Sequence, residues 1–392
     1  MVGEAKWLEK LREFVYDLLV FAHKEKHMNS QDVFCPNMEC AARGQVGEGN
    51  VIGHGRKRPR FCCKVCGKTF GPRTGTPLHR RSTAIEVIVQ VVTLVSYGCP
   101  IPAIEAAFGV QARTVREWVR ASGRQCEGVQ QHLVVQPQEL GQVQADELRV
   151  KLAGGVVWMA MAMVVASRLW LGGAVSAKRD YKLVERVAQL VARSAAGQRV
   201  MIVVDGFVAY IEAFKRACAT YVKHAKGGRR TCVTWPGLVI AQVVKRAPNG
   251  EWLVHRLVQG GVRNFLTGLW STEGCQVLNT AFIERLNGTF RARLSPLVRR
   301  TRALARHADT LTHSMNLVGA CYNFCSLHAS LTTRDGQRRT PAMAAGIADH
   351  LWSVQELLSY RVPPPRWVPP RPRGRRSRAF QALIDRWAPT HH

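Results

Sequence analysis

The sequence predicts a multidomain α/β protein, and three observations lead to this prediction. A short glycine-rich stretch near the start carries two close pairs of cysteines. Three short helical patterns separated by turn signals follow it, and from about residue 140 strand patterns alternate with amphipathic helices. At 392 residues, the chain is long enough for two or three domains and a large buried core.

The charge balance points to the kind of partner. Lysine and arginine outnumber aspartate and glutamate by 56 to 27, which gives a formal net charge of +29. An excess of this size favours a polyanionic partner, most often nucleic acid. The alternative is a basic solvated surface without a specific ligand. Because the excess is spread over the whole chain, a basic tail alone does not account for it.

Targeting signals and cysteine usage indicate the compartment. Charged residues occur throughout the first twenty positions, which excludes a signal peptide, and the longest apolar run, Val156 to Ala166, is too short for a membrane helix. Five of the twelve cysteines lie between residues 35 and 66. In a cytosolic chain such clustering indicates a metal site plus free thiols. We therefore expect a cytoplasmic protein with no membrane partner.

The first element expected is an amphipathic helix over residues 5–22, within an N-terminal segment of residues 1–33. Residues 34–75 follow as a predicted zinc ribbon. Two close cysteine pairs separated by a loop suit a tetrahedral four-thiolate zinc site, and the pairs are Cys35 with Cys40 and Cys63 with Cys66. The first pair is wider than usual, Cys62 competes as a ligand, and a cluster of reduced cysteines is the alternative.

The loop between the cysteine pairs is basic. Its side chains suit phosphate contact, although a solvated loop is equally consistent with them. They are Arg56, Lys57 and Arg58.

Residues 80–125 fit a helix-turn-helix. Helical spacing covers Thr83 to Val95, about Pro102 to Phe108, and about Ala112 to Ser122, with Gly109 at the turn. Residues at the exposed start of the third helix would read base edges in DNA. These are Gln111, Arg113, Thr114 and Arg116. A helical hairpin linking two domains is the alternative, and a polar linker is expected to follow.

The run VMIVV before Asp205 and Gly206 predicts a strand buried on both faces. A carboxylate at the carboxyl end of a central strand lies where open α/β sheets usually place their chemistry. The alternative role for Asp205 is a helix N-cap, because FVAYIEAFKRA follows with helical spacing.

Three strands precede that run, and several elements follow it. The predicted strands are Gln142 to Lys151, Val156 to Ala166 and Leu169 to Ser176, with a helix over Tyr181 to Arg193. Residues 232–262 are expected to be a β-rich insertion, because Pro248-Asn249-Gly250 joins two β-rich runs. Further helices are expected over Asn279 to Arg293 and His307 to His328. Residues 346–392 are expected to be a basic Pro- and Arg-rich tail, disordered from Pro363 to Arg378.

Three consecutive strands, a helix and a buried strand follow one another in the order of the ribonuclease H-like fold. In that topology the first and fourth strands are adjacent, which would bring Asp146 and Asp205 together beside the helix that carries Glu284. Three crowded carboxylates repel one another unless cations lie between them. Hard oxygen ligands suit Mg²⁺ or Mn²⁺. The catalytic core is therefore predicted as a mixed sheet within residues 140–345.

Several motifs resemble those of bacterial insertion-sequence transposases of the DDE class, in the ribonuclease H-like superfamily that includes retroviral integrases. They are QADELRVK around Asp146, SRLWLGGAVSAKRD, VVDGF around Asp205, and NTAFIERLNGTFR around Glu284. YNFCSLHASL with the later TPA looks like the end of integrase-type catalytic domains. The resemblance covers about residues 34–345. The spacing from Asp205 to Glu284 is longer than in retroviral integrases, which is consistent with an insertion.

The resemblance implies a transposase that binds the terminal inverted repeats of its element and cuts and joins DNA by two-metal phosphoryl transfer. Asp146, Asp205 and Glu284 would form the catalytic triad and hold Mg²⁺ or Mn²⁺. Successive strand residues face opposite sides, so only one of Asp146 and Glu147 should face the site, and the resemblance selects Asp146. Side chains after Glu284 would lie along bound DNA: Arg285, Asn287, Arg291 and Arg293.

The implied partners are double-stranded element ends, target DNA and a second copy of the chain, because two DNA ends must be held together in a dimer or larger assembly. Two other functions remain open. One is a catalytically inactive, transposase-derived DNA-binding protein. The other is a ribonuclease H-like nuclease without strand transfer, which suits the zinc and helix-turn-helix modules less well.

Overall fold

A computed structural model describes residues 28–55, 59–197, 199–223, 229–245, 253–270, 277–298, 304–305, 307–371 and 374–388. The chain divides into two compact units. The terminal unit combines Met1–His79 with Arg361–His392, and the core unit spans Arg80–Tyr360. The predicted helix over residues 5–22 and the basic loop Arg56 to Arg58 lie outside the described residues.

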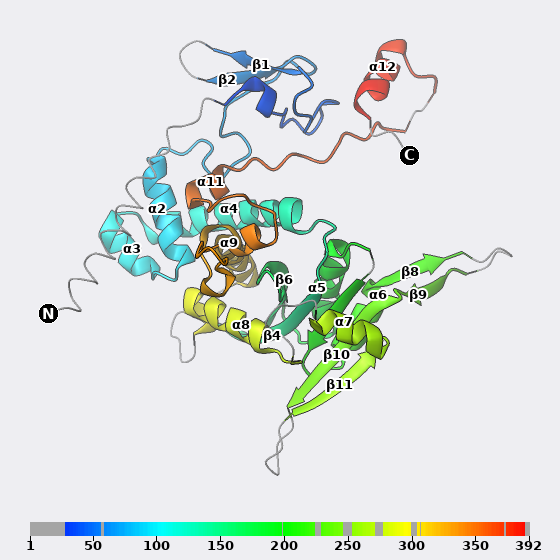
Figure 1. Ribbon diagram of the computed structural model, residues 1–392. Helices are drawn as coiled ribbons and strands as arrows, with labels where there is room; N and C mark the ends of the chain where they lie inside the picture. Colours follow the sequence, from blue (N-terminus) through cyan, green and yellow to red (C-terminus); the bar gives the residue numbers. More distant parts are fainter. Residues whose placement is uncertain are drawn as a thin grey trace. The chain divides into compact units, whose positions relative to one another are not determined.

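The terminal unit is built on a small antiparallel sheet in the order β1-β2-β3 (Figure 1). The short helix η1 (Ser30–Asp32) precedes β1 (Val51–His54), β2 (Arg60–Cys63) and β3 (Thr69–Phe70). Alternation along β2 buries Phe61 and Cys63 and leaves Cys62 partly exposed. A hydrophobic core therefore forms on the cysteine-bearing side of the sheet, as a small ribbon-like module requires.

The C-terminal segment is not the disordered tail that the composition predicts. From Arg361 the chain belongs to the terminal unit, while residues 346–360 and helix α11 (Val354–Ser359) belong to the core unit. Helix α12 (Arg378–Trp387) buries Trp387 in the same cluster as Phe61. The proline-rich stretch lacks many N–H groups and lies extended, so a few apolar anchors suffice to order it.

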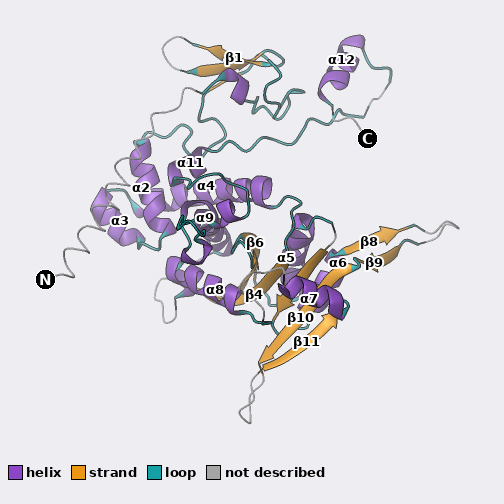
Figure 2. Cartoon of the chain, viewed as in Figure 1, coloured by secondary structure: helices purple, strands orange, loops and turns teal. Residues whose placement is uncertain are grey.

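The core unit begins with α2 (Ile85–Ser96), α3 (Ile101–Phe108) and α4 (Ala112–Val129), which gather beside α9 (Ala308–Cys325) and α11 in Figure 2. Between α3 and α4, Gly109 adopts a left-handed φ of 64° and makes the tight turn expected of a helix-turn-helix.

Helix α4 is longer than the sequence predicts and replaces the expected linker. It continues through Gly123 into the π-helical turn η2 (Gln130–Val134). A Cβ added at Gly123 would lie 2.2 Å from the His313 carbonyl oxygen of α9. This glycine therefore permits close helix packing rather than marking a linker. Helices α2 to α4 and the sheet belong to one unit.

The core sheet has six strands in the order β11-β10-β7-β4-β5-β6. The bounds are β4 (Gln142–Leu152), β5 (Gly155–Val164), β6 (Trp170–Ser176), β7 (Arg199–Val204), β10 (Gly237–Lys245) and β11 (Leu253–Gln259). β4, β5 and β6 pair antiparallel, whereas β7 runs parallel to both β4 and β10. The mixed sheet and the adjacency of the first and fourth strands agree with the predicted ribonuclease H-like arrangement.

The expected insertion over residues 232–262 is placed differently. Its first long strand, β10, is a central strand of the core sheet, and β11 pairs with it at the edge. The apolar run of β10 can be buried against β7, which the hairpin signal alone did not reveal. The segment outside the sheet is instead the two-stranded ribbon of β8 (Ala219–Val222) and β9 (Thr231–Thr234).

Helices cover both faces of the sheet. α5 (Tyr181–Ser194) and α6 (Ala209–Ala217) lie on one face, and α7 (Val262–Trp270), α8 (Ala281–Arg293) and α9 lie on the other. Neighbouring glycines of β6 show the two faces: a Cβ at Gly172 would meet Leu190 of α5, and one at Gly173 would meet Met315 of α9. Three short helices complete the unit: η3 (Ser295–Leu297), η4 (Ala329–Leu331) and α10 (Pro341–Ala344).

Within the described ranges, no helix is both long enough and apolar enough to cross a membrane.

Candidate active site and cysteine centre

Three carboxylates meet where β4 passes the end of β7. Asp146, Glu147 and Asp205 each offer an oxygen within 4.8 Å of the others. The parallel pairing of β4 with β7 ends at Gln144 and Val203, so the next residues on the same face are Asp146 and Asp205. The expected meeting of these two aspartates is therefore observed.

Only one of Asp146 and Glu147 was expected to approach the site, but the carboxylates of both residues do so. The Glu147 side chain does lie on the opposite face from Asp146, where the Tyr210 hydroxyl donates to Oε2 at 2.7 Å. β7 stops at Val204, however, so no strand separates the two faces beyond that point. Carboxylates from both sides of β4 therefore approach Asp205.

Arg179 neutralises part of this charge. Its guanidinium forms a hydrogen-bonded ion pair with Glu147 Oε1 and lies 3.6 Å from Asp205 Oδ2. The guanidinium also lies 4.3 Å from the Phe207 ring centroid, which fixes its plane. Together, Arg179 and Tyr210 engage both oxygens of the buried Glu147. Both oxygens of Asp146 are engaged as well, by the Glu147 N–H at 2.8 Å and by the Asn287 amide at 2.7 Å.

Asp205 does not cap helix α6. Its Oδ1 accepts a hydrogen bond from the Phe207 N–H at 2.9 Å, which forms a local turn, whereas the N-cap of α6 is Val208. The Gln242 side chain donates to the Asp205 carbonyl oxygen at 3.0 Å and ties this turn to β10. Asp205 Oδ2 is left facing the acidic cluster.

Crowding and burial disfavour negative charge here. Burial, followed by the charges of Glu147 and Asp205, raises the pKa of Asp146 to about 7. Burial also raises the pKa of Glu147, against the opposing effects of Tyr210 and Arg179. Acidic oxygens at this spacing suit a hard divalent cation such as Mg²⁺ or Mn²⁺, which would favour the ionised forms.

Helix α8 is fixed against β4 by amide side chains. Gln144 donates to the Asn279 carbonyl at 2.7 Å and accepts from the Ile283 N–H at 2.9 Å. One turn further, Asn287 donates to Asp146 Oδ2 at 2.7 Å. These contacts hold the first two turns of α8 beside the acidic cluster.

Glu284 lies on this helix, one turn before Asn287, but its carboxylate is not one of the three clustered within 4.8 Å. The Glu284 side chain is exposed and accepts a hydrogen bond from Thr280 Oγ1 at 2.9 Å. Glu284 therefore shares a helix with Asn287, which contacts Asp146, but the structure does not bring the Glu284 carboxylate into the cluster.

Two of the residues that were expected to contact DNA, Asn287 and Arg293, instead bind other side chains of the protein. Asn287 is only 2% exposed and orients Asp146, so its burial does not fit a DNA contact. Arg293 donates to Ser326 Oγ and stacks 4.6 Å from the Tyr97 ring centroid, which joins α8 to the helix-turn-helix. Arg285 is exposed and Arg291 is partly buried.

The predicted recognition residues lie at the start of α4. Gln111 is the residue before the helix, and Arg113 and Arg116 are exposed, whereas Thr114 is partly buried. Arg113 pairs with Glu117 at 3.4 Å, an exposed contact that contributes little stability. Glu105 accepts from the Ala112 N–H at 3.2 Å and stabilises the turn.

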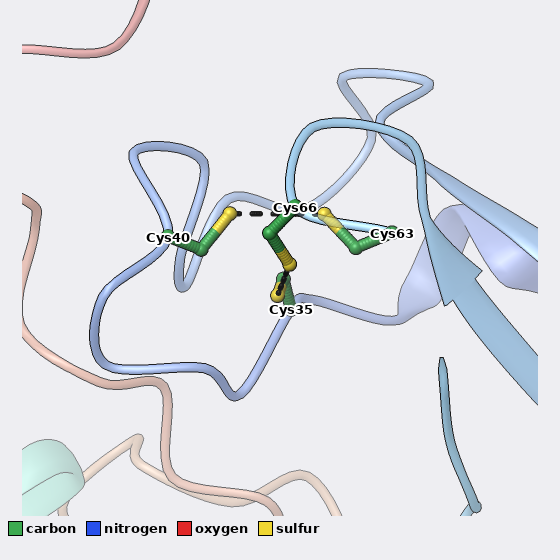
Figure 3. A group of neighbouring side chains, drawn as sticks. All are labelled: Cys35, Cys40, Cys63 and Cys66. Atoms are coloured by element: carbon green, nitrogen blue, oxygen red, sulfur yellow. Dashed lines mark hydrogen bonds between the residues drawn. The ribbon is translucent and has the colours of Figure 1, made fainter. Parts of the chain in front are cut away.

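The four predicted cysteines converge in the terminal unit, and each Sγ lies within 4.8 Å of the others (Figure 3). The Cys35–Cys66 and Cys40–Cys63 sulfur distances are both 3.7 Å. A tetrahedral site with Zn–S bonds of about 2.3 Å separates its sulfurs by about 3.8 Å. The described residues therefore fit zinc. Cys62 faces away from this cluster because it alternates with Cys63 on β2.

Thiol acidity within the cluster is uneven. Burial raises the pKa of Cys40 to about 12. Burial acts in the same direction on Cys66, but hydrogen bonds from the Lys68 backbone, Asn37 and neighbouring thiols lower the pKa of Cys66 to about 7. Cys66 is thus deprotonated for metal binding more readily than Cys40.

Arg361 borders the cysteine cluster. Its guanidinium donates to the Phe34 carbonyl at 3.2 Å and stacks 4.5 Å from the Phe34 ring centroid. The Arg361 Nε is buried and has no hydrogen-bond partner among the described residues. Burial lowers the pKa of Arg361 to about 10, while the charge of Cys35 opposes this shift.

Local signals exist for some of the site residues that the sequence analysis did not identify. Gln144 and Arg179 both lie inside motifs that carry the resemblance. Gln144 is two residues before Asp146, and Arg179 lies just before the predicted helix over Tyr181 to Arg193. Tyr210 is in the run after Asp205. Arg361 carried no local signal, because only folding brings it beside Cys35.

Comparison with solved structures gives distant likenesses. The chain is similar to a piggyBac transposase, solved as a synaptic complex with hairpin DNA, at 9% identity and a TM-score of 0.31 over 80% of each chain. A likeness this weak does not reveal the activity. No protein-family model and no curated protein matches the chain.

Proposed function

We propose that the chain is a DNA transposase of the DDE class, which binds the terminal inverted repeats of an insertion element and catalyses metal-dependent strand cleavage and strand transfer. One observation carries this proposal: Asp146 and Asp205 converge from adjacent parallel strands, and α8 is tied to Asp146 through Asn287. A carboxylate cluster at the carboxyl end of a central strand is a suitable site for phosphoryl-transfer chemistry.

In the proposed mechanism, Asp146 and Asp205 would hold Mg²⁺ or Mn²⁺, and Glu284 would complete the ligand set in place of its hydrogen bond with Thr280. The bound ions would activate a water or a DNA 3′-hydroxyl and stabilise the leaving 3′-oxygen during in-line displacement. Asn287 fixes the orientation of Asp146, and Gln144 fixes the helix that carries Glu284.

Glu147 has a supporting role in this proposal. Arg179 and Tyr210 engage its two oxygens on the face of β4 opposite Asp146, so Glu147 would position Arg179 beside Asp205. Arg179 holds Asp205 at 3.6 Å and can move to a phosphate once divalent cations neutralise the acids.

DNA recognition in the proposal uses two modules. The start of α4 presents Gln111, Arg113 and Arg116 for base or phosphate contact in double-stranded element ends. The terminal unit, held by a structural zinc ion on its four cysteines, adds contacts from the basic loop that contains Arg56 to Arg58. Two DNA ends must be joined, so the active form is a homodimer or a larger assembly on nucleoid DNA.

The test uses the purified protein and duplex DNA that carries the sequences flanking its own gene. With Mg²⁺ or Mn²⁺, we expect nicking or joining at those ends. Asp205→Ala and Asp146→Asn should lower this activity by at least about 10³-fold while end binding persists. The exposed Asp309→Asn serves as a charge-matched control and should retain activity.

Specific end binding without strand chemistry in any divalent metal would favour the other function, a transposase-derived DNA-binding protein. The exposed position of Glu284 outside the cluster is the observation that keeps this alternative relevant. Cleavage of RNA–DNA hybrids without preference for the ends would instead favour a ribonuclease H-like nuclease.

A further inference from the structure

The ribbon formed by β8 and β9 is separate from the core sheet. It makes a two-stranded sheet of its own and extends away from the six-stranded sheet in Figure 1. At its base, the Trp235 N–H donates to the Cys218 carbonyl at 2.9 Å, which closes the ribbon beside the end of α6. The ribbon is therefore anchored to the helix that follows Asp205.

Both faces of this ribbon expose apolar side chains. The register places Tyr221 opposite Cys232 and Thr220 opposite Val233, so alternate pairs face opposite sides. Tyr221 is 60% exposed, Val222 48% and Val233 47%. A two-stranded hairpin is only marginally stable alone in water. Apolar exposure on both faces indicates that the ribbon inserts into a partner rather than lying flat on one.

The described residues nearest the tip of the ribbon are basic. They are Lys223, directly after β8, and Arg229 and Arg230, directly before β9, and all three are exposed. Across the described part of the chain, no acidic side chain forms an ion pair with any of these three.

We infer that the β8–β9 ribbon enters the major groove of the duplex DNA on which this protein acts, with Lys223, Arg229 and Arg230 on the phosphates. This inference rests on the proposed function and assigns it a further DNA contact. A strand of four residues is about 13 Å long, and the major groove is about 12 Å wide and accommodates a two-stranded ribbon. Threonine, tyrosine and valine side chains can contact base edges and thymine methyl groups there.

The position of the ribbon fits this role. Helix α6 runs from just after Asp205 to the root of the ribbon and spans nine residues, about 14 Å. DNA gripped by the ribbon would therefore be continuous with DNA at the acidic cluster. A second copy of the chain is a poorer partner, because the basic residues of two identical ribbons repel and neither strand carries an acid.

The first test measures DNA binding by Arg229→Ala/Arg230→Ala across a series of salt concentrations. Loss of two phosphate contacts should flatten the slope of log K against log salt by about 2 and weaken binding roughly 30-fold near 0.15 M salt. Arg334→Ala/Arg338→Ala removes the same charge from another exposed loop and should change neither quantity appreciably.

The second test uses Cys232, which is exposed on β9. DNA should slow its modification by a maleimide probe, and Cys232→Ser identifies the signal that belongs to this thiol. The inference would be overturned, with the proposed function left intact, if the Arg229→Ala/Arg230→Ala variant bound DNA with the wild-type affinity and salt slope and if DNA did not protect Cys232. Protection that rises with protein concentration without DNA would assign the ribbon to a second copy. If the wild type binds no duplex DNA, the proposed function fails as well.

Discussion

At the scale of single residues, the raised pKa of Asp146 makes the stability of the core unit depend on pH. In an unfolded chain its carboxyl would titrate near its ordinary pKa of 3.8, whereas burial and neighbouring acids raise the folded pKa to about 7. Between these values the folded state binds more protons than the unfolded state. The free energy of unfolding therefore falls as pH rises from about 4 to 7.

We predict that Asp146→Asn removes this pH dependence in magnesium-free buffer. The variant should be more stable than wild type at pH 8, by an amount on the order of a few kcal/mol, and similar to it at pH 4. Thermal melting of the core unit at both pH values measures this. Added Mg²⁺ should raise the wild-type melting temperature more than that of the variant, and equal gains would contradict the prediction.

Arg361 offers a residue-scale test of the cysteine centre. Four thiolates and one Zn²⁺ carry a net charge of about −2, which a buried guanidinium beside Cys35 offsets. Arg361→Met should weaken zinc binding about 10- to 100-fold, as loss of other outer-sphere partners does.

Competition with a chromogenic chelator measures the zinc affinity of this variant. The exposed Arg366→Met, five positions along the same segment, should leave zinc binding unchanged. Equal affinity in both variants would show that Arg361 only packs against Phe34.

At the scale of elements, the contact between α4 and α9 depends on one glycine. A Cβ at position 123 would lie 2.2 Å from a backbone oxygen, so the helices must move apart to admit alanine. We expect Gly123→Ala to destabilise the core unit by about 1–3 kcal/mol, although alanine is the better helix former.

Gly288 on α8 provides the matched control, because an added Cβ there meets nothing within 4 Å. Gly288→Ala should be neutral or stabilising by about 0.5–1 kcal/mol. Denaturant melts of both variants report the difference, and stabilisation by Gly123→Ala would show that the helices are not in close contact.

At the scale of the whole molecule, the chain leaves the terminal unit at His79 and returns to it at Arg361. Both ends of the chain therefore build the cysteine-bearing unit, which is discontinuous in sequence. Trp387 and Arg361, far from the cysteines along the chain, complete its core. Loss of the C-terminal segment should thus affect zinc and not only DNA contacts.

We predict that deleting residues 361–392 releases zinc from the protein and leaves the melting of the core unit nearly unchanged. The physical reason is that a module of this size has too little core to lose a buried tryptophan and a charge-compensating arginine. Zinc content by elemental analysis and two-transition calorimetry measure the two effects. Val368→Ala, at a side chain that is 70% exposed, is the control that should keep its zinc.

Local sequence patterns were enough to predict the buried strand before Asp205, the order of the strands and the cysteine cluster. The run before Asp205 indicated a strand buried on both faces, and the order of strands and helices placed Asp146 beside it, as the sheet confirms. Cysteine spacing indicated a four-thiolate cluster that the structure also contains. Such features depend on periodicity, turn chemistry and ligand spacing, which act over a few residues and are visible in a sequence.

Three further features were decided only by the tertiary structure: the place of β10, the approach of Glu147 to Asp205, and the position of Arg361. Only strand pairing showed that β10 belongs to the core sheet, because a buried parallel strand and an inserted hairpin have the same apolar pattern. Only the end of β7 let Glu147 approach from the far face of β4, and only folding brought Arg361 to Cys35. Burial and charge compensation arise between residues distant in sequence, so no local pattern encodes them.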